Sequence, residues 1–259
     1  MRGMLASDFQ RLFLSPKFIG SVIGTALTYL CNAACFERSA FQNYSELLDG
    51  SAAPFFQLVL LVFAALPFAT AFCEDWENRY IRAILIRTST SKYAASKCIV
   101  CFVGALCTGI LGTLLMMLLA MPFLEDIGFG NGGNFIALAT MYPTGINGIL
   151  VHGGWALWLF ATSAIRAFTG CIYAMLALCV STKITNVFVT LAMPVIGYAI
   201  YQNISGILQF PTFLYETYFS QNINFDLPNT VISLGIMLAV WVLFFAILSI
   251  AVRRKLENE

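Results

Sequence analysis

The sequence is constrained most by six apolar stretches, each about as long as a membrane's hydrocarbon core is thick. That core measures about 30 Å, and a helix needs roughly 20 residues to cross it. The six stretches lie at about residues 18–36, 54–73, 98–123, 155–180, 186–207 and 231–252. Because lipid offers the backbone no hydrogen-bond partners, such stretches must be helical. The sequence therefore predicts an all-α membrane protein in which residues 1–259 form one transmembrane domain with six transmembrane helices.

The composition supports a lipid environment. Hydrophobic residues make up 59% of the chain and charged residues 10%, whereas about 25% of the residues in a typical soluble domain are charged. The eight cysteines lie almost entirely within the apolar stretches, where cysteine behaves as a small apolar residue. We therefore expect membrane lipid and no nucleic acid among the partners, and neither disulfides nor a metal site.

The basic residues predict the orientation of the helices. Lys and Arg gather in four segments: before the first stretch, between the second and third, between the fourth and fifth, and after the sixth. Twelve of the 14 basic residues fall there. By the positive-inside rule, these four segments face the cytoplasm. We therefore predict a multi-pass protein of the cell (cytoplasmic) membrane with cytoplasmic N and C termini.

Residues 1–17 are predicted to form an amphipathic helix that lies in the membrane surface. The apolar positions that recur at helical spacing are Leu5, Phe9, Leu12 and Phe13. Polar residues occupy the rest of the helix, as expected for an interfacial segment. Pro16 then marks a break before the first transmembrane helix. The alternative is a disordered tail.

Residues 74–97 form the longest predicted cytoplasmic connection. Trp76, Tyr80 and Ile84 recur every four residues and predict one apolar face of a helix. Further residues complete the face and the charged remainder of this helix: Glu74, Glu77, Arg79, Ile81, Arg82, Leu85 and Arg87. The helix is predicted to end in the hydroxyl-rich residues 88–91, with Ser91 capping the next helix. Three interpretations remain open: a linker, a helix lying on lipid, or an element that docks into a cytoplasmic partner.

This segment resembles the coupling region of type-2 ABC transporter permeases, the ABC-2 family of transmembrane subunits. In that family the second span leads into an acidic cluster and an amphipathic coupling helix. The residues that carry the resemblance are Glu74, Glu77, Ile81, Leu85, Ile86, Ser91, Tyr93 and Lys97. The surface helix, the six spans and the cytoplasmic termini agree with it. The resemblance implies a subunit that pairs with an identical or homologous permease and binds two ABC ATPase subunits through the coupling helix.

The resemblance also implies an exporter that moves a hydrophobic or amphipathic cargo, such as a peptide, antibiotic or lipid-linked molecule. No Gly-Lys pair, and so no Walker-type phosphate loop, occurs in the chain. We therefore expect a transport subunit with no catalytic residues and no cofactor of its own, with ATP and Mg bound by the partner. The alternative is an ATP-independent multi-pass membrane protein, either a channel or an assembly factor.

Polar residues inside the apolar stretches are candidates for a cargo path. They are Gln57, Arg166, Tyr198, Tyr201, Gln202 and Asn203. Such residues also serve as hydrogen bonds between helices. For Arg166, a second interpretation is that the fourth span begins near Ala164, which would leave the arginine at the outer headgroups.

Overall fold

The protein is described here by a computed structural model that covers residues 2–36, 54–85, 88–123, 155–208 and 227–257. These residues form helices and no strand, which confirms the all-α prediction. The α-helices are α1 (Arg2–Phe13), α2 (Pro16–Phe36), α4 (Pro54–Ala65), α5 (Ala71–Glu77), α6 (Tyr80–Leu85), α7 (Thr90–Ala120), α10 (Trp155–Ser181), α11 (Val187–Leu208) and α13 (Leu227–Glu257), and a short 3₁₀ helix, η3 (Met121–Phe123), follows α7.

Each of the six predicted apolar stretches is helical, but the second is not continuous. Its helix α4 ends at Ala65, and turns lead from there to α5 at Ala71. Pro67 lies in this interruption, where its missing N–H removes one helical hydrogen bond. The third stretch is longer than predicted, because α7 already begins at Thr90 and runs for 31 residues.

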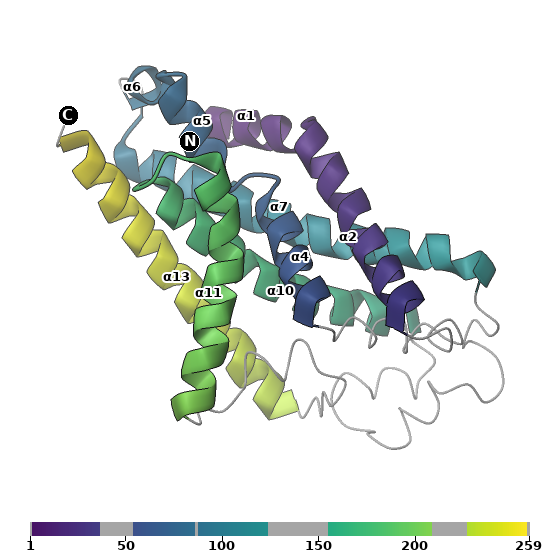
Figure 1. Cartoon of the computed structure of the whole chain (residues 1–259). Helices are drawn as coiled ribbons and strands as arrows, with labels where there is room; N and C mark the ends of the chain where they lie inside the picture. The colour runs from purple at the N-terminus through teal and green to yellow at the C-terminus, as the bar shows by residue number, and fades with distance from the viewer. Residues whose placement is uncertain (1, 37–53, 86–87, 124–154, 209–226, 258–259) are drawn as a thin grey trace.

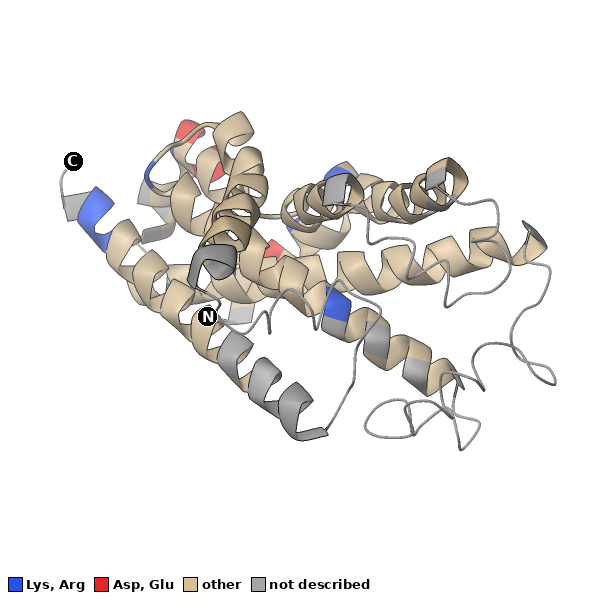
Figure 2. Cartoon of the chain, turned by 60° about the horizontal axis from the view of Figure 1, so that its bottom comes forward, with Lys and Arg blue, Asp and Glu red and all other residues tan. Residues whose placement is uncertain are grey.

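Three of the described helices are long and apolar enough to cross a membrane: Thr90–Ala120, Leu159–Ser181 and Val187–Ile204. A shorter apolar helix covers Phe56–Ala65. The described helices are mostly tan in Figure 2, because few of their residues are charged. Such helices are characteristic of a membrane protein.

Helix α7 lies at the centre of the bundle and contacts α1, α2, α4, α10 and α13. Helices α1, α5 and α6 lie in the upper part of Figure 1, together with the marked N and C ends of the chain. The two ends of the chain are therefore on the same side of the bundle as the segment between the second and third apolar stretches.

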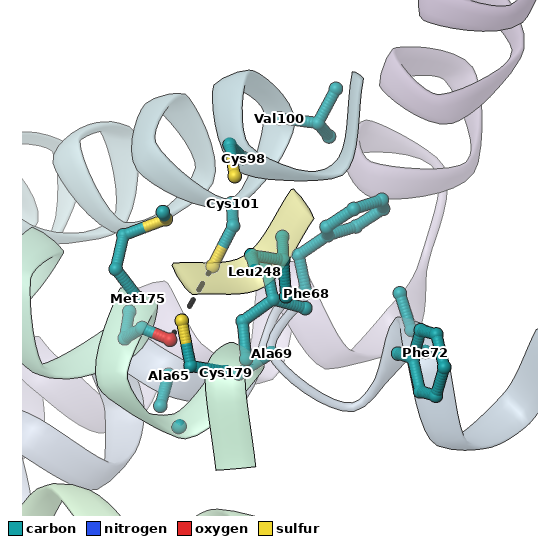
Figure 3. Close-up of a cluster of buried hydrophobic side chains, with 14 of the residues drawn as sticks. Ala65, Phe68, Ala69, Phe72, Cys98, Val100, Cys101, Met175, Cys179 and Leu248 are labelled. Atoms are coloured by element: carbon teal, nitrogen blue, oxygen red, sulfur yellow. Dashed lines mark hydrogen bonds between the residues drawn. The ribbon is translucent and has the colours of Figure 1, made fainter. Parts of the chain in front are cut away.

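The core forms where α7, α10 and α13 meet the turn before α5 (Figure 3). Phe68, Met175 and Leu248 are buried there, beside several free thiols. Cys101 Sγ donates to the Ala174 carbonyl oxygen at 3.7 Å, which links α7 to α10. The cysteines thus pack as apolar residues, and the described residues contain no group of three metal-ligating side chains.

Glycines allow α7 to approach its neighbours closely. A Cβ atom added to Gly109 would lie 2.4 Å from the Cβ of Ala167 on α10, and one added to Gly112 would lie 2.5 Å from Thr25 on α2. Gly20 on α2 is different, because its added Cβ would meet no atom within 4 Å. The contacts of α7 with α2 and α10 therefore require small residues on α7.

We expect Gly109→Ala to lower the free energy of unfolding by about 1–3 kcal/mol, because overpacking forces α7 and α10 apart. Thermal unfolding of the purified protein in a neutral detergent would measure the loss. Gly20→Ala is the matched control and should change the melting temperature little. Equal melting temperatures for the two variants would contradict this packing.

Candidate coupling site and cargo path

The predicted coupling helix is two helices, so the prediction of one continuous helix is wrong. Helix α5 ends at Glu77, and α6 begins at Tyr80. The Asn78 side chain donates to the Glu74 carbonyl oxygen at 2.8 Å, and Arg79 adopts a φ of 57°. An asparagine that bonds the last turn, followed by a left-handed residue, is a common way to end a helix.

The break changes which side chains reach the surface. Ile81, predicted to be on the docking face, is 2% exposed and belongs to the core, whereas Tyr80 is 61% exposed. Trp76 and Ile84 are half-buried against that core. The predicted face is therefore divided between the core and the surface.

The remaining predicted contact residues differ in exposure. Glu77 and Arg79 are exposed at the turn between α5 and α6. The side chains of Arg82, Leu85 and Arg87 lie outside the described part of the structure. Helix α7 is not capped by Ser91 as predicted; its N-cap position is Ser89, in an extended conformation with φ −73° and ψ 150°. We call the exposed residues Glu77–Tyr80 the tip.

The acidic residues just before the tip bind basic residues from the N-terminal helices. Arg11 on α1 contacts Glu74 at 2.6 Å and Asp75 at 2.5 Å through its two terminal nitrogens. Lys17 at the start of α2 also pairs with Glu74. Helix α5 is thus joined to α1 and α2 by charge.

Lys97 on α7 lies at the buried side of the same cluster. Its side chain is 3% exposed, and its Nζ lies 2.8 Å from Asp8 Oδ1 and 2.8 Å from Asp75 Oδ2. Ser96 donates to Asp8 at 2.7 Å, and Tyr93 donates to Asp75 at 2.9 Å. Both carboxylates that face Lys97 are therefore held by further hydrogen bonds.

We call the six charged residues that form these ion pairs the ion-pair cluster. Three are acidic and three are basic, namely Asp8, Glu74, Asp75, Arg11, Lys17 and Lys97. The cluster is therefore electrically neutral as a whole and joins α1, α2, α5 and α7. The pairs of Lys97 with Asp8 and Asp75 are buried, and such pairs are costly to separate because each partner would be left without compensation. The pairs of Glu74 with Arg11 and Lys17 are partly exposed and therefore weaker. Together these contacts join the four helix ends into one unit.

The predicted cargo-path residues lie in two places. Tyr198 on α11 donates to Gln57 Oε1 on α4 at 2.8 Å, and Gln202 Nε2 donates to the Tyr198 hydroxyl at 3.2 Å. Tyr201 is half-buried, and Asn203 is exposed and bonds to the Ala199 carbonyl of its own helix. Gln57, Tyr198 and Gln202 therefore form one polar contact between α4 and α11.

Arg166 lies elsewhere, on the wall of a cavity of about 50 Å³ that is lined by residues of α2, α4, α7 and α10. Helix α10 begins at Trp155, eleven residues before Arg166, which corresponds to roughly 16 Å along the helix. The alternative that the membrane-spanning part of this helix begins near Ala164 stays a prediction. None of the other described cargo-path candidates lines this cavity.

No protein-family model matches this sequence, and no curated protein or solved structure matches it either.

We expect Lys97→Met to destabilise the protein by about 3–5 kcal/mol, because it leaves two buried carboxylates with one unbalanced negative charge. Adding Asp8→Asn makes the total charge of the ion-pair cluster zero again, so the double variant should regain part of the lost stability. Thermal unfolding of the single and double variants in detergent would measure both effects. Lys183→Met, at an exposed position, is the control. A double variant as unstable as the sum of its single changes would contradict the cluster.

Acid should also loosen this cluster. Burial opposes the charged form of Glu74 and Asp75, but Lys17 and Arg11 bonded to Glu74, and Lys97 and Arg11 bonded to Asp75, outweigh it and lower the pKa of both carboxyls. A lowered pKa stabilises the fold at pH values above the pKa of the unfolded chain, which is 4.5 for Glu74 and 3.8 for Asp75. This stabilisation is lost as the pH falls through the lower pKa of the folded state.

We therefore expect the melting temperature to drop as the pH is lowered from about 5 to 3. Glu74→Gln should flatten this dependence, because it removes one of the two carboxyls whose pKa is lowered. Melting curves recorded at half-unit pH steps would measure the slope. Parallel pH profiles for Glu74→Gln and the unmodified protein would count against this assignment.

Proposed function

We propose that this chain is the transmembrane permease subunit of an ATP-binding cassette exporter of the type-2 kind. In this proposal it crosses the cell membrane six times, with both termini in the cytoplasm and α1 as the surface helix. Two ABC ATPase subunits bind and hydrolyse ATP with Mg, and a second permease, identical or homologous, completes the transporter. The cargo is hydrophobic or amphipathic: a peptide, an antibiotic or a lipid-linked molecule.

The observation that carries the proposal is the exposed tip joined to four helices by the ion-pair cluster. The tip lies on the same side of the bundle as both chain ends (Figure 1), and that side holds the basic segments that the positive-inside rule assigns to the cytoplasm. A cytoplasmic partner would find Glu77, Arg79 and Tyr80 exposed there. These features favour a docking element over a simple linker.

The cluster supplies a route for force from the tip into the bundle. When an ATPase displaces the tip, α5 moves with it because the two are continuous in the chain. Helices α1, α2 and α7 follow, since holding them back would pull Glu74 and Asp75 away from Arg11, Lys17 and Lys97. Motion at the tip is thereby converted into motion of α7, which is long and apolar enough to span the membrane.

Helix α13 joins the same unit through its C-terminal end. Lys255 Nζ lies 4.0 Å from the centre of the Trp76 ring and 5.3 Å from that of Phe72. Contacts of an ammonium with an aromatic face contribute about 0.5–2 kcal/mol, depending on exposure. The tip is therefore coupled to the last apolar helix as well as to the first.

Tyr80→Ala tests the proposal. Exposed tyrosines often dominate the binding energy of an interface, so the variant should capture at least tenfold less ABC ATPase in a pull-down from membranes. ATP-driven export should fall in parallel, while membrane insertion stays unchanged. Phe188→Ala, at another exposed aromatic residue away from the tip, is the matched control.

Two results would overturn the proposal. If no ABC ATPase co-purifies with the unmodified chain, an ATP-independent channel or assembly factor becomes the better explanation. If Tyr80→Ala and Phe188→Ala capture the ATPase equally well, the tip is not the docking element.

A further inference from the structure

We propose that the cavity beside Arg166 binds the anionic head group, a carboxylate or phosphate, of an amphipathic molecule. To call that molecule the cargo rests on the proposed function; the binding itself does not. The residues that line the cavity come from four helices of a single chain.

The polar side chains of the cavity suit an anion. Arg166 lines it from α10, and Thr25 and Tyr29 line it from α2. A guanidinium carries five N–H donors in a fork that matches carboxylate and phosphate, so it can keep a protein partner and still donate to a ligand. The two hydroxyls can donate as well. Among the described residues that line the cavity, none is Asp or Glu.

Two further hydroxyls on α7 line the cavity but are committed to the backbone. Thr108 donates to the Gly104 carbonyl oxygen and Thr113 to that of Gly109, each at 2.8 Å. Each hydroxyl has a single proton, so neither threonine can also donate a hydrogen bond to a ligand. The donors to an anion therefore come from α2 and α10, and a bound anion would draw those two helices together.

The remaining lining is small and apolar. It consists of Leu60, Leu61, Ala64, Ala105, Gly109, Ala167 and Gly170. On this measure a water molecule needs roughly 10–15 Å³, so about 50 Å³ admits a group of only a few heavy atoms. The cavity is thus large enough for a head group and too small for a whole amphiphile, whose chain would extend along the apolar leucines.

The position of Arg166 makes a purely structural role costly. The residue lies within Leu159–Ser181, one of the helices apolar enough to span a membrane. Arginine inside a span is rare and usually faces a water-filled cavity or a functional path. A cavity beside its guanidinium is what a binding site at this depth requires.

The test uses the full chain, purified in dodecyl maltoside, with laurate as the probe. Calorimetric titration should give an affinity for laurate at least tenfold higher than for dodecanol, which has the same chain without the charge. Arg166→Gln should weaken laurate binding at least tenfold, and Arg166→Lys should retain most of it. Arg254→Gln removes one exposed positive charge away from the cavity and should bind like the unmodified chain.

A second variant covers the case in which Arg166→Gln fails to fold. Ala105→Leu fills the cavity and keeps the arginine, so it should lose laurate binding as well. Competition by inorganic phosphate would identify a site for free anions, and no competition would identify one for amphiphiles; both results support anion recognition. Equal affinities for laurate and dodecanol, or unchanged binding in Ala105→Leu, would overturn it.

The outcome is independent of the ATPase. If laurate binds but no ABC ATPase co-purifies, the permease proposal fails and the anion site stands. If the ATPase is captured but laurate binding does not depend on Arg166, only the anion site fails.

Discussion

This end of the structure depends on the ion pairs that the buried ammonium of Lys97 forms with Asp8 and Asp75. An uncompensated charge at such a position would cost several kcal/mol. Two carboxylates lie against it, Asp8 from α1 and Asp75 from α5, each at 2.8 Å, and Arg11 balances the second negative charge. These contacts hold two helices on the first turns of α7. Packing reinforces this placement, because Leu12 of α1 lies against Gly104 of α7.

The same constraint explains why α5 is held in the bundle, whereas α6 begins with an exposed residue. The end of α5 is held from inside by its carboxylates, so it cannot also serve as a freely exposed docking face. The chain therefore turns at Asn78 and Arg79, and this turn leaves Tyr80 outside and Ile81 inside. In the proposed function, the residues that bind a partner and those that anchor α5 to the bundle are therefore adjacent but separate.

The sequence predicted the helices well because the length and apolarity of a segment are local properties. The spacing of Trp76, Tyr80 and Ile84 indicates one helix and so does not predict the break at Arg79. Asn78, a residue type that favours helix ends, is the signal in the sequence that could have predicted this break. The ion pairs could not be predicted in the same way. Lys97 and Asp8 are 89 residues apart, and only the packing of α1 on α7 brings them together. Three of the basic residues that predict the orientation in the membrane, Arg11, Lys17 and Lys97, pair with acidic residues in the structure.

Helix α7 links the ion-pair cluster to the cavity beside Arg166. In the cluster, Lys97 holds the first turns of α7 to Asp8 and Asp75. Further along, Thr108 and Thr113 of α7 line the cavity, while Gly109 and Gly112 pack closely on α10 and α2. A displacement imposed at the cluster would therefore reach the walls of the cavity through α7 and the helices packed against it.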